Sequence, residues 1–312
     1  MKEITVGIGI AAHNEEANIG RLLQNILTQP LEDFFVLKEI IVVTSGCTDR
    51  TAEIVEEFAT KDKRVKHIKE EERRGKSSAV NLILKNAQDK DVLVMLSADN
   101  LPEKGALNNI IKPLVGVTSY ELRKEKIGAV SSRPTPVNDR TTLFGFIAHL
   151  IWDLHYALSL KGNVKLTGEF YAMKPALVKE IPQVVNDDLY IEYSIKKQGY
   201  GIKQALDAIS YMNGPETLKD FMTQRIRVHI GHYQITRMTG YVPQTVKARG
   251  ILREMIKIVE LKRMHFLIAA IFLELSAKVL ALFLFHRNKI PYEWDYAEST
   301  KNFNFKEKGN NF

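Results

Sequence analysis

A continuous apolar run that ends in a small polar cluster constrains the fold of this chain more than any other feature. Residues 92–96 (Val-Leu-Val-Met-Leu) are followed by Ser97, Ala98, Asp99 and Asn100. A run of this length and composition is typical of a strand buried on both faces of a parallel sheet. Open α/β sheets bind their ligands at the carboxyl ends of such strands. We therefore expect Asp99 at the mouth of a crevice, where its carboxylate can bind a divalent cation.

Strands and helices alternate along the chain before this point, which is typical of a parallel sheet with crossover helices. The predicted strands cover 4–12, 39–43 and 65–68, and the predicted helices lie around 19–27, 52–59 and 79–84. Asn14 is predicted as the N-cap of the first helix. Glu15 and Glu16 are then expected in its first turn, where the helix dipole favours acidic side chains.

The polar segments at the ends of these elements resemble, in order and spacing, the motifs of the inverting family 2 glycosyltransferases of the GT-A fold. They are Ala-His-Asn-Glu-Glu at 12–16, the turn at 44–51, the Gly-Lys segment at 75–81, Ser-Ala-Asp at 97–99, the acidic segment at 185–200 and Gln-Arg-Ile-Arg-Val at 224–228. No single segment is specific, but six in this order are, and the resemblance covers roughly residues 4–235. It implies an α/β GT-A fold, with a mostly parallel central sheet, flanking helices and additional C-terminal hydrophobic helices.

The resemblance also implies roles for single positions of this sequence. Asp188 matches the catalytic base, which takes the proton of an acceptor hydroxyl, and Asp187 matches its acidic neighbour. Gly168 and Glu169 belong to the segment expected to approach the sugar, where a glycine allows a close backbone. The residues expected to bind a nucleotide-sugar donor are Ala12, Asn14, Glu15, Ser45, Lys76, Asp99, Gln224 and Arg227.

The residue patterns alone leave simpler interpretations open at two of these places. Asp187 and Asp188 precede an apolar helical pattern that stops at Gly199. The simpler interpretation is that Asp187 caps this helix and has no other role. Glu169 can equally form a surface salt bridge. For the helix histidines His229 and His232, ordinary surface positions remain the alternative to metal binding.

A divalent cation, Mg²⁺ or Mn²⁺, is the expected cofactor. Asp99 is the expected ligand, and His232 is a candidate second ligand because a neutral imidazole suits transition metals. The family pattern is incomplete here. Thr44 and Ser45 stand where the family usually has two aspartates, Ser97 replaces the first acid of Asp-x-Asp, and Val228 replaces the tryptophan of Gln-x-x-Arg-Trp. The identity of the nucleotide base, the sugar and the acceptor therefore stays open.

The C-terminal part, residues 241–312, is predicted to be a helical tail separate from a catalytic domain at 1–240. Apolar and basic residues alternate at helical spacing over 251–263, and a mainly apolar run follows at 266–285. Such a run is long enough to cross a bilayer. Glu274 and Lys278 are four residues apart and can pair, but each is costly in hydrocarbon. A membrane span, a helix lying in the membrane interface and a helix for dimerisation all remain open, and membrane association is expected.

The composition of the chain limits the classes of molecule that it is expected to bind. The chain has 312 residues, one cysteine, which excludes an internal disulfide, and a net charge of +7. The basic residues gather at 61–76 and 247–263 without a groove-reading motif, so anionic sugar nucleotides and lipids are expected rather than nucleic acid. The first residues pass directly into a strand, so no signal peptide is expected. The expected location is the cytoplasm or the cytoplasmic face of the cell membrane, and the oligomeric state is not predicted.

The sequence thus predicts a glycosyltransferase that moves a sugar from a nucleotide donor to an acceptor hydroxyl with inversion. The acceptor is a polyprenyl phosphate, another lipid-linked molecule or a growing glycan. Two alternatives stay open. A nucleotidyltransferase uses a related sheet, although it usually has a glycine-rich basic loop after the first strand, which His13 to Glu16 do not provide. A catalytically degenerate scaffold that binds sugar nucleotides or protein partners is the second.

Overall fold

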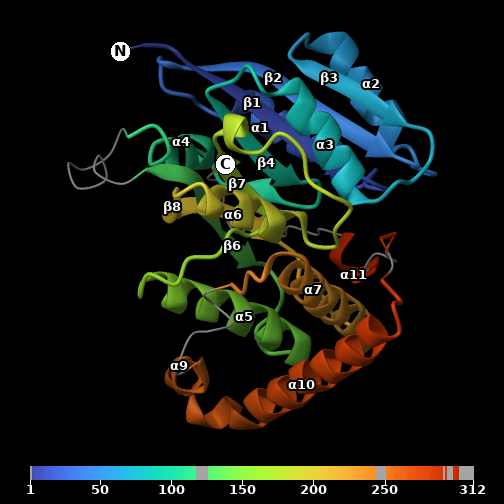
Figure 1. The fold of residues 1–312 in the computed structure, drawn as a ribbon, viewed down its shortest axis with the longest axis vertical. Coiled ribbons are helices and arrows are strands. Elements are labelled where there is room, and N and C mark those ends of the chain that lie inside the picture. The colour runs from blue at the N-terminus through green and yellow to red at the C-terminus, as the bar shows by residue number, and fades with distance from the viewer. Residues whose placement is uncertain (1, 117–125, 244–250, 291, 294–297, 302–312) are drawn as a thin grey trace.

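The computed structural model describes residues 2–116, 126–243, 251–290, 292–293 and 298–301. Within these residues one eight-stranded sheet runs in the order β3-β2-β1-β4-β7-β6-β8-β5 (Figure 1). The strands are β1 (Ile4–Ala12), β2 (Phe35–Ser45), β3 (Val65–Glu70), β4 (Val92–Ser97), β5 (Leu101–Pro102), β6 (Ile127–Pro136), β7 (Phe170–Met173) and β8 (Gly201–Met212).

The sheet is mixed rather than uniformly parallel. Strands β3, β2, β1 and β4 are parallel, as the sequence predicts. Strand β7 is antiparallel to both β4 and β6, whereas β8 is parallel to β6. In the parallel part Ala12 pairs with Thr44, and Ala11 pairs with Ser97. This register brings the carboxyl ends of three strands, and the polar segments that follow them, to one edge of the sheet.

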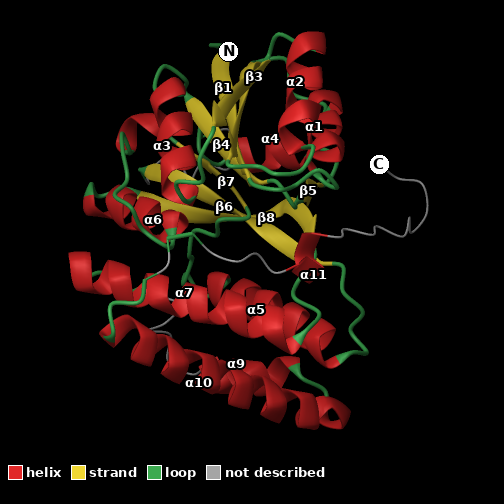
Figure 2. Ribbon diagram, turned by 90° about the vertical axis from the view of Figure 1, so that its right-hand side faces the viewer, coloured by secondary structure: helices red, strands yellow, loops and turns green. Residues whose placement is uncertain are grey.

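Helices cover both faces of the sheet (Figure 2). Apolar side chains of α1, α2 and α4 pack with alternate residues of β1, such as Ile8 and Ile10. On the other face α3 and α6 pack against Ile41, Val43 and Leu93. The helices are α1 (Ile19–Thr28), α2 (Thr51–Lys61), α3 (Lys76–Asn86), α4 (Ala106–Ile111) and α6 (Asp187–Lys197), with a short 3₁₀ helix at Pro175–Leu177.

A separate helical layer lies beyond one end of the sheet, with α5, α7, α9 and α10 side by side (Figure 2). Its elements are α5 (Leu143–Ser159), α7 (Leu218–Thr239), α9 (Ile251–Ile258), a 3₁₀ helix at Leu261–Arg263, and α10 (Met264–His286). Thr142 and Thr217 cap α5 and α7 by accepting from Gly145 N and Asp220 N. Helix α7 ends at Gly240, which has a φ of 71°, a conformation that favours glycine at a helix C-terminus.

One side of helix α10 packs into this layer, and the other side is exposed. Leu267, Ala270, Ala277 and Ala281 are buried against α5 and α7. The exposed side carries Ile268, Phe272, Leu275, Val279, Leu282 and Phe283. The predicted pairing of Glu274 with Lys278 is wrong. Glu274 instead binds Arg225 and His229 of α7, because a guanidinium can take both carboxylate oxygens.

The start of the first helix also differs from the prediction. Helix α1 begins at Ile19 with Asn18 at the N-cap position, so neither Asn14 as N-cap nor Glu15 and Glu16 in the first turn is correct. Asn14 has a φ of 52°, and its side chain exchanges hydrogen bonds with Thr48. These bonds hold the segment after β1 against the turn after β2, which delays the helix.

Candidate functional site

A cavity of about 350 Å³ lies at the carboxyl edge of the parallel strands, beneath the helical layer. Most residues that the sequence predicts for the site line it. They are Ala12, Glu15, Ser45, Lys76, Asp99, Gly168, Glu169, Asp187, Asp188, Gln224 and Arg227. Two predicted residues, Asn14 and His232, are not among the lining residues.

Asp99 lies directly after β4, where the sequence predicts it. Its Oδ1 atom is buried and has no hydrogen-bond partner among the described residues. Two further carboxyl groups face the same region. Burial and the charge of Asp99 raise the pKa of Glu15 and that of Glu169 to about 7. A bare carboxylate oxygen surrounded by acids is a favourable place for a cation.

The donor set around Asp99 fits a hard cation that is shared with a ligand. The described residues contain no group of three or more His, Cys, Asp and Glu side chains that could hold a metal ion alone. Mg²⁺ sites commonly use only one or two carboxylates and complete the shell with substrate phosphates and water. The Nε2 atom of His232 lies 3.5 Å from the Lys165 ammonium. A role of His232 as second ligand therefore stays a prediction, and would require Nε2 to turn away from Lys165.

Asp187 and Asp188 begin helix α6 and have different partners. The Asp187 Oδ1 atom lies 3.3 Å from Lys76 Nζ, and burial raises the pKa of Asp187 despite this cation. The Asp188 carboxylate accepts from Gly168 N at 3.1 Å and Leu189 N at 2.8 Å. Asp187 is thus not a simple helix cap, as one interpretation of the sequence had it, but half of an ion pair in the cavity wall.

The segment before β7 connects these acids with Asp99. A Cβ on Gly168 would lie 3.5 Å from Lys76 Nζ and 3.6 Å from Asp188, so this backbone passes between the two side chains. Glu169 accepts a hydrogen bond from Asn100 Nδ2 at 3.1 Å. The surface salt bridge that the sequence left open for Glu169 is therefore not formed, because the side chain turns into the cavity.

Helix α7 supplies Gln224, Arg225 and Arg227 to the lining. The charge of Arg227 acts on both Lys76 and Glu169, so the guanidinium lies near both groups. The helix can come this close because residue 231 is glycine. A Cβ there would lie 2.2 Å from Asn186 Cγ, at the start of α6.

Of the two positions where the resemblance leads one to expect aspartates, only Ser45 faces the cavity. Its carbonyl oxygen accepts a hydrogen bond from His13 Nδ1 at 2.7 Å, while its buried hydroxyl has no partner among the described residues. Thr44 turns to the other face of the sheet and bonds His67 at 2.8 Å. Ser45 thus belongs to the lining of this end of the cavity, whereas Thr44 does not.

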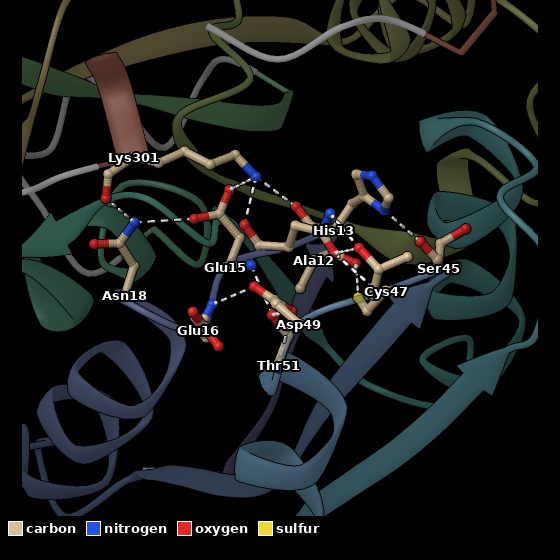
Figure 3. A network of polar contacts seen from close by, with 12 residues as sticks. Ala12, His13, Glu15, Glu16, Asn18, Ser45, Cys47, Asp49, Thr51 and Lys301 are labelled. Carbon is tan, nitrogen blue, oxygen red and sulfur yellow. Dashed lines mark hydrogen bonds and ion pairs between the residues drawn. The ribbon is translucent and has the colours of Figure 1, made fainter. Parts of the chain in front are cut away.

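Lys301 in α11 (Glu298–Lys301) is among the basic residues of the site that sequence reasoning missed. Its ammonium donates to the carbonyls of His13 at 2.5 Å and Asn14 at 2.6 Å, and lies 3.0 Å from Glu15 Oε1 (Figure 3). Asn18 in turn donates to the Lys301 carbonyl at 2.8 Å. No local pattern in the sequence predicts these contacts, because nearly the whole chain separates the partners.

The predicted separation of the tail from the catalytic domain is therefore wrong in one respect. Tyr292, Thr300 and Lys301 line the cavity together with residues of the first 240 positions. Ser299 donates from its amide and its hydroxyl to Asp220 of α7. Residues 244–250 and 302–312 of the predicted tail lie outside the described residues.

Strand-end loops around a cavity in a mixed sheet of this order define the GT-A, or nucleotide-diphospho-sugar transferase, fold. A solved structure of the mannosyltransferase PcManGT from Pyrobaculum calidifontis, in complex with GDP-Man and Mn²⁺, matches with a TM-score of 0.57 at 22% identity, over 98% of this chain and 89% of that one. The glucosyl-3-phosphoglycerate synthase of Mycobacterium tuberculosis matches with a TM-score of 0.50 at 20% identity, over 75% and 80% of the two chains. These likenesses show the fold.

Residues 8–116 match the family model described as Glycosyl transferase family 2. Among curated relatives, the poly-beta-1,6-N-acetyl-D-glucosamine synthase of Staphylococcus aureus is 27% identical over 236 residues, which cover 72% of this chain and 54% of the relative. The enzyme of the same name from Staphylococcus epidermidis is 26% identical over the same length. The chain spans about half the length of the curated relatives it matches.

Proposed function

We propose that this protein transfers a sugar from a nucleotide-sugar donor to an acceptor hydroxyl with inversion. The observation that carries the proposal is the meeting of three groups on one cavity: Asp99 with a bare carboxylate oxygen, Asp188 held by backbone amides, and Arg227. The family 2 domain supports it, as do the synthase name of the relatives and the nucleotide sugars bound in solved structures of the same fold.

The proposed donor side is the strand-end wall. Ala12, Glu15 and Ser45 bound the place of the nucleoside, with Asn14 bracing the loop through Thr48. Lys76, Gln224 and Arg227 are the side chains suited to the diphosphate, since a guanidinium can pair with it in a planar, bidentate way. Asp99 would hold a Mg²⁺ or Mn²⁺, which neutralises charge on a leaving diphosphate when bound.

The proposed acceptor side is the region of Gly168, Glu169 and the α6 N-terminus. Inversion requires a base on the face of the sugar opposite the leaving group. Asp188 is suited to this role because two backbone amides fix its carboxylate while it still lines the cavity. Asp187 neutralises Lys76 beside it and so keeps the lysine oriented toward the donor.

Donor binding gives the direct test. In calorimetry, UDP- and GDP-sugars are titrated with and without Mn²⁺ against the full chain, Asp99→Asn and Asp207→Asn, an exposed control on β8. The unmodified chain and Asp207→Asn should bind one donor in a Mn²⁺-dependent way, and Asp99→Asn should lose this dependence because a hard oxygen ligand is gone. Equal affinity in all three would remove Asp99 from the site. Binding without sugar transfer to any acceptor would favour the degenerate scaffold.

We further propose that the exposed side of α10 attaches the protein to a membrane at its cytoplasmic face. Among the described residues one helical stretch, Leu261–His286, is long and apolar enough to span a bilayer, with a mean hydropathy of 2.3. Its packing along α7 and α5 supports a helix lying in the interface over a spanning one, because one side is already covered by protein. Basic residues such as Arg253, Lys257 and Lys262 accompany the apolar face, which suits anionic lipid headgroups.

A further inference from the structure

The helical wall of the cavity is apolar, unlike the strand-end wall. Helix α5 contributes Phe144, Ile147, Ile151 and Trp152 to the lining, and α7 contributes Phe221. The rings of Phe144 and Phe221 pack at a centroid distance of 6.0 Å. A nucleotide or a sugar hydroxyl would find few polar partners along these side chains. The wall is suited to a hydrocarbon chain.

The apolar wall continues into the layer beneath it. Phe144, Ile147 and Ile151 belong to one apolar cluster with Phe266, Leu267 and Ala270 of α10. Phe146, on the same helix, packs against Phe266 at a centroid distance of 5.5 Å. The lining of the cavity is therefore connected, through α5, with the helix whose other side is bare.

A cation that lacks a carboxylate partner lies at the end of this wall. Lys165 lines the cavity and has no ion pair with an acidic side chain among the described residues. Its ammonium lies 3.5 Å from His232 Nε2. Burial, together with the charges of Lys165 and Arg225, lowers the pKa of His155 to about 3, so this imidazole is neutral at pH 7.

The neighbouring basic residues do not remove this surplus. Arg225 is neutralised by Glu274, with contacts of 2.6 and 2.8 Å. Arg133 of β6 lies 4.5 Å above the ring of Tyr156 and borders a small adjoining cavity together with Lys165 and His155. Two cations, Lys165 and Arg133, thus border the small adjoining cavity beside His155, and their combined charge favours an anion there.

We propose that this part of the cavity binds an amphiphile with a phosphate head, the phosphate on Lys165 and the hydrocarbon chain along α5. Lysine is a common phosphate partner because its ammonium acts as a mobile point charge. That the amphiphile is the acceptor rests on the proposed function, whereas the site itself does not. Its place three residues before Gly168 puts the head group on the same segment that reaches Asp188.

Tryptophan fluorescence gives a test with a reporter inside the site. The chain has two tryptophans, Trp152 in the lining and Trp294, so Trp294→Phe leaves Trp152 as the only emitter. Octyl phosphate, octyl glucoside and inorganic phosphate are titrated below their micellar concentrations against the full chain with this background. Octyl phosphate should bind at least tenfold more tightly than either control, because only it has both the charge and the chain.

Matched variants identify the residue responsible. Lys165→Gln should reduce octyl phosphate binding to the level of octyl glucoside, Lys165→Arg should restore most of it, and Lys179→Gln, which removes an exposed lysine on the same domain, should change nothing. Circular dichroism and melting of each variant show whether it folds. If Lys165→Gln is unfolded, the comparison of Lys165→Arg with the unmodified chain decides, since loss of the preference in a folded arginine variant contradicts the proposal.

Two results would overturn the inference. Equal binding of octyl phosphate and octyl glucoside would show that the site does not select an anion. Equal binding of octyl phosphate and inorganic phosphate, unaffected by Ile151→Asn, would show a free-phosphate site and no lipid chain. Neither depends on donor binding, so failure of the Asp99 experiment and failure of this one are distinguishable.

Discussion

The strand-end wall and the helical wall line one cavity but differ in chemistry and in construction. Asp99, Glu15, Asp187 and Lys76 crowd the strand-end wall, where each charge has a charged neighbour. The part of the helical wall that α5 and Phe221 form is mainly aromatic and aliphatic, with Lys165, which has no acidic partner among the described residues, at its end. One wall is suited to a diphosphate and a cation, the other to an amphiphile.

The two walls also owe their geometry to different forces. Hydrogen-bonded register, such as Ala12 opposite Thr44 and Ala11 opposite Ser97, fixes the strand ends. Apolar packing, together with the ion pair between Arg225 and Glu274, holds α5, α7 and α10 together. We therefore expect changes in the strand-end wall to alter mainly catalysis and changes in the helical layer to alter mainly acceptor and membrane binding.

The largest expected effect is on turnover. Asp188→Asn should lower the turnover rate by about a hundredfold or more, the range for loss of a general base, while donor affinity stays nearly constant. Asp187→Asn should be milder, because Asp187 orients Lys76 and does not contact the reacting hydroxyl in the proposed arrangement. Steady-state kinetics and donor calorimetry on both variants check this. If the two effects are exchanged, Asp187 is the base.

Substitutions on the exposed side of α10 should reduce membrane binding and leave donor binding unchanged. Phe272 and Val279 are each 68% exposed on the bare side of α10. Changing both to glutamate removes insertion energy of about 1.5–3 kcal/mol per side chain, so sedimentation with anionic liposomes should fall at least tenfold. Gln24→Glu with Thr60→Glu adds the same charge on exposed positions of the sheet region and is the control. An unmodified chain that ignores liposomes would refute membrane attachment and favour packing against protein.

Point variants are the better tool here than shortening the chain. A chain that ends near Gly250 would lose Tyr292, Thr300 and Lys301 from the cavity together with α10. Carbonate extraction of the unmodified chain then separates the two membrane arrangements. An interfacial helix should be released at least in part, whereas a spanning helix should resist.

A smaller effect is expected in the pH dependence of stability. The pKa of Glu169 is raised to about 7 by burial and Asp99, so between pH 4.5 and 7 the folded state binds more protons than the unfolded state. The free energy of unfolding should therefore fall as the pH rises through this window. In Glu169→Gln the free energy of unfolding should fall less across this window. The difference should be on the order of 1 kcal/mol after allowance for solvent screening. Urea denaturation at several pH values measures it, and an unchanged slope would contradict the assignment.

Local sequence patterns predict the strand-end wall well and the contacts between distant elements poorly. The buried run before Asp99 and the order of the polar segments are local, and they lead correctly to a cavity that Asp99, Asp188 and Arg227 line. Glu274 shows the limit. Helical spacing suggests Lys278 as its partner, but the arrangement of α10 on α7 brings a bidentate arginine closer.

The loop after β1 shows the same limit at a smaller scale. Asn14 before an apolar helical pattern fits the rule for N-caps, and the rule fails because Thr48 and Asp49, on another loop, take up the available donors and acceptors. Such bonds depend on the register of β1 and β2. The residue pattern of one segment therefore cannot predict hydrogen bonds between two loops.

The contacts of Lys301 connect helix α11 with the loop that follows β1, and this connection can couple membrane binding to donor binding. The ammonium joins the loop of His13, Asn14 and Glu15 to α11, which follows α10 in the chain (Figure 3). Two ligands that act on one shared contact are linked, and linkage is reciprocal. If a bound donor changes the affinity of the protein for a membrane through α11, membrane binding must change the affinity for the donor by the same factor. Titration of the nucleotide in the presence and absence of liposomes would read out that factor from either side.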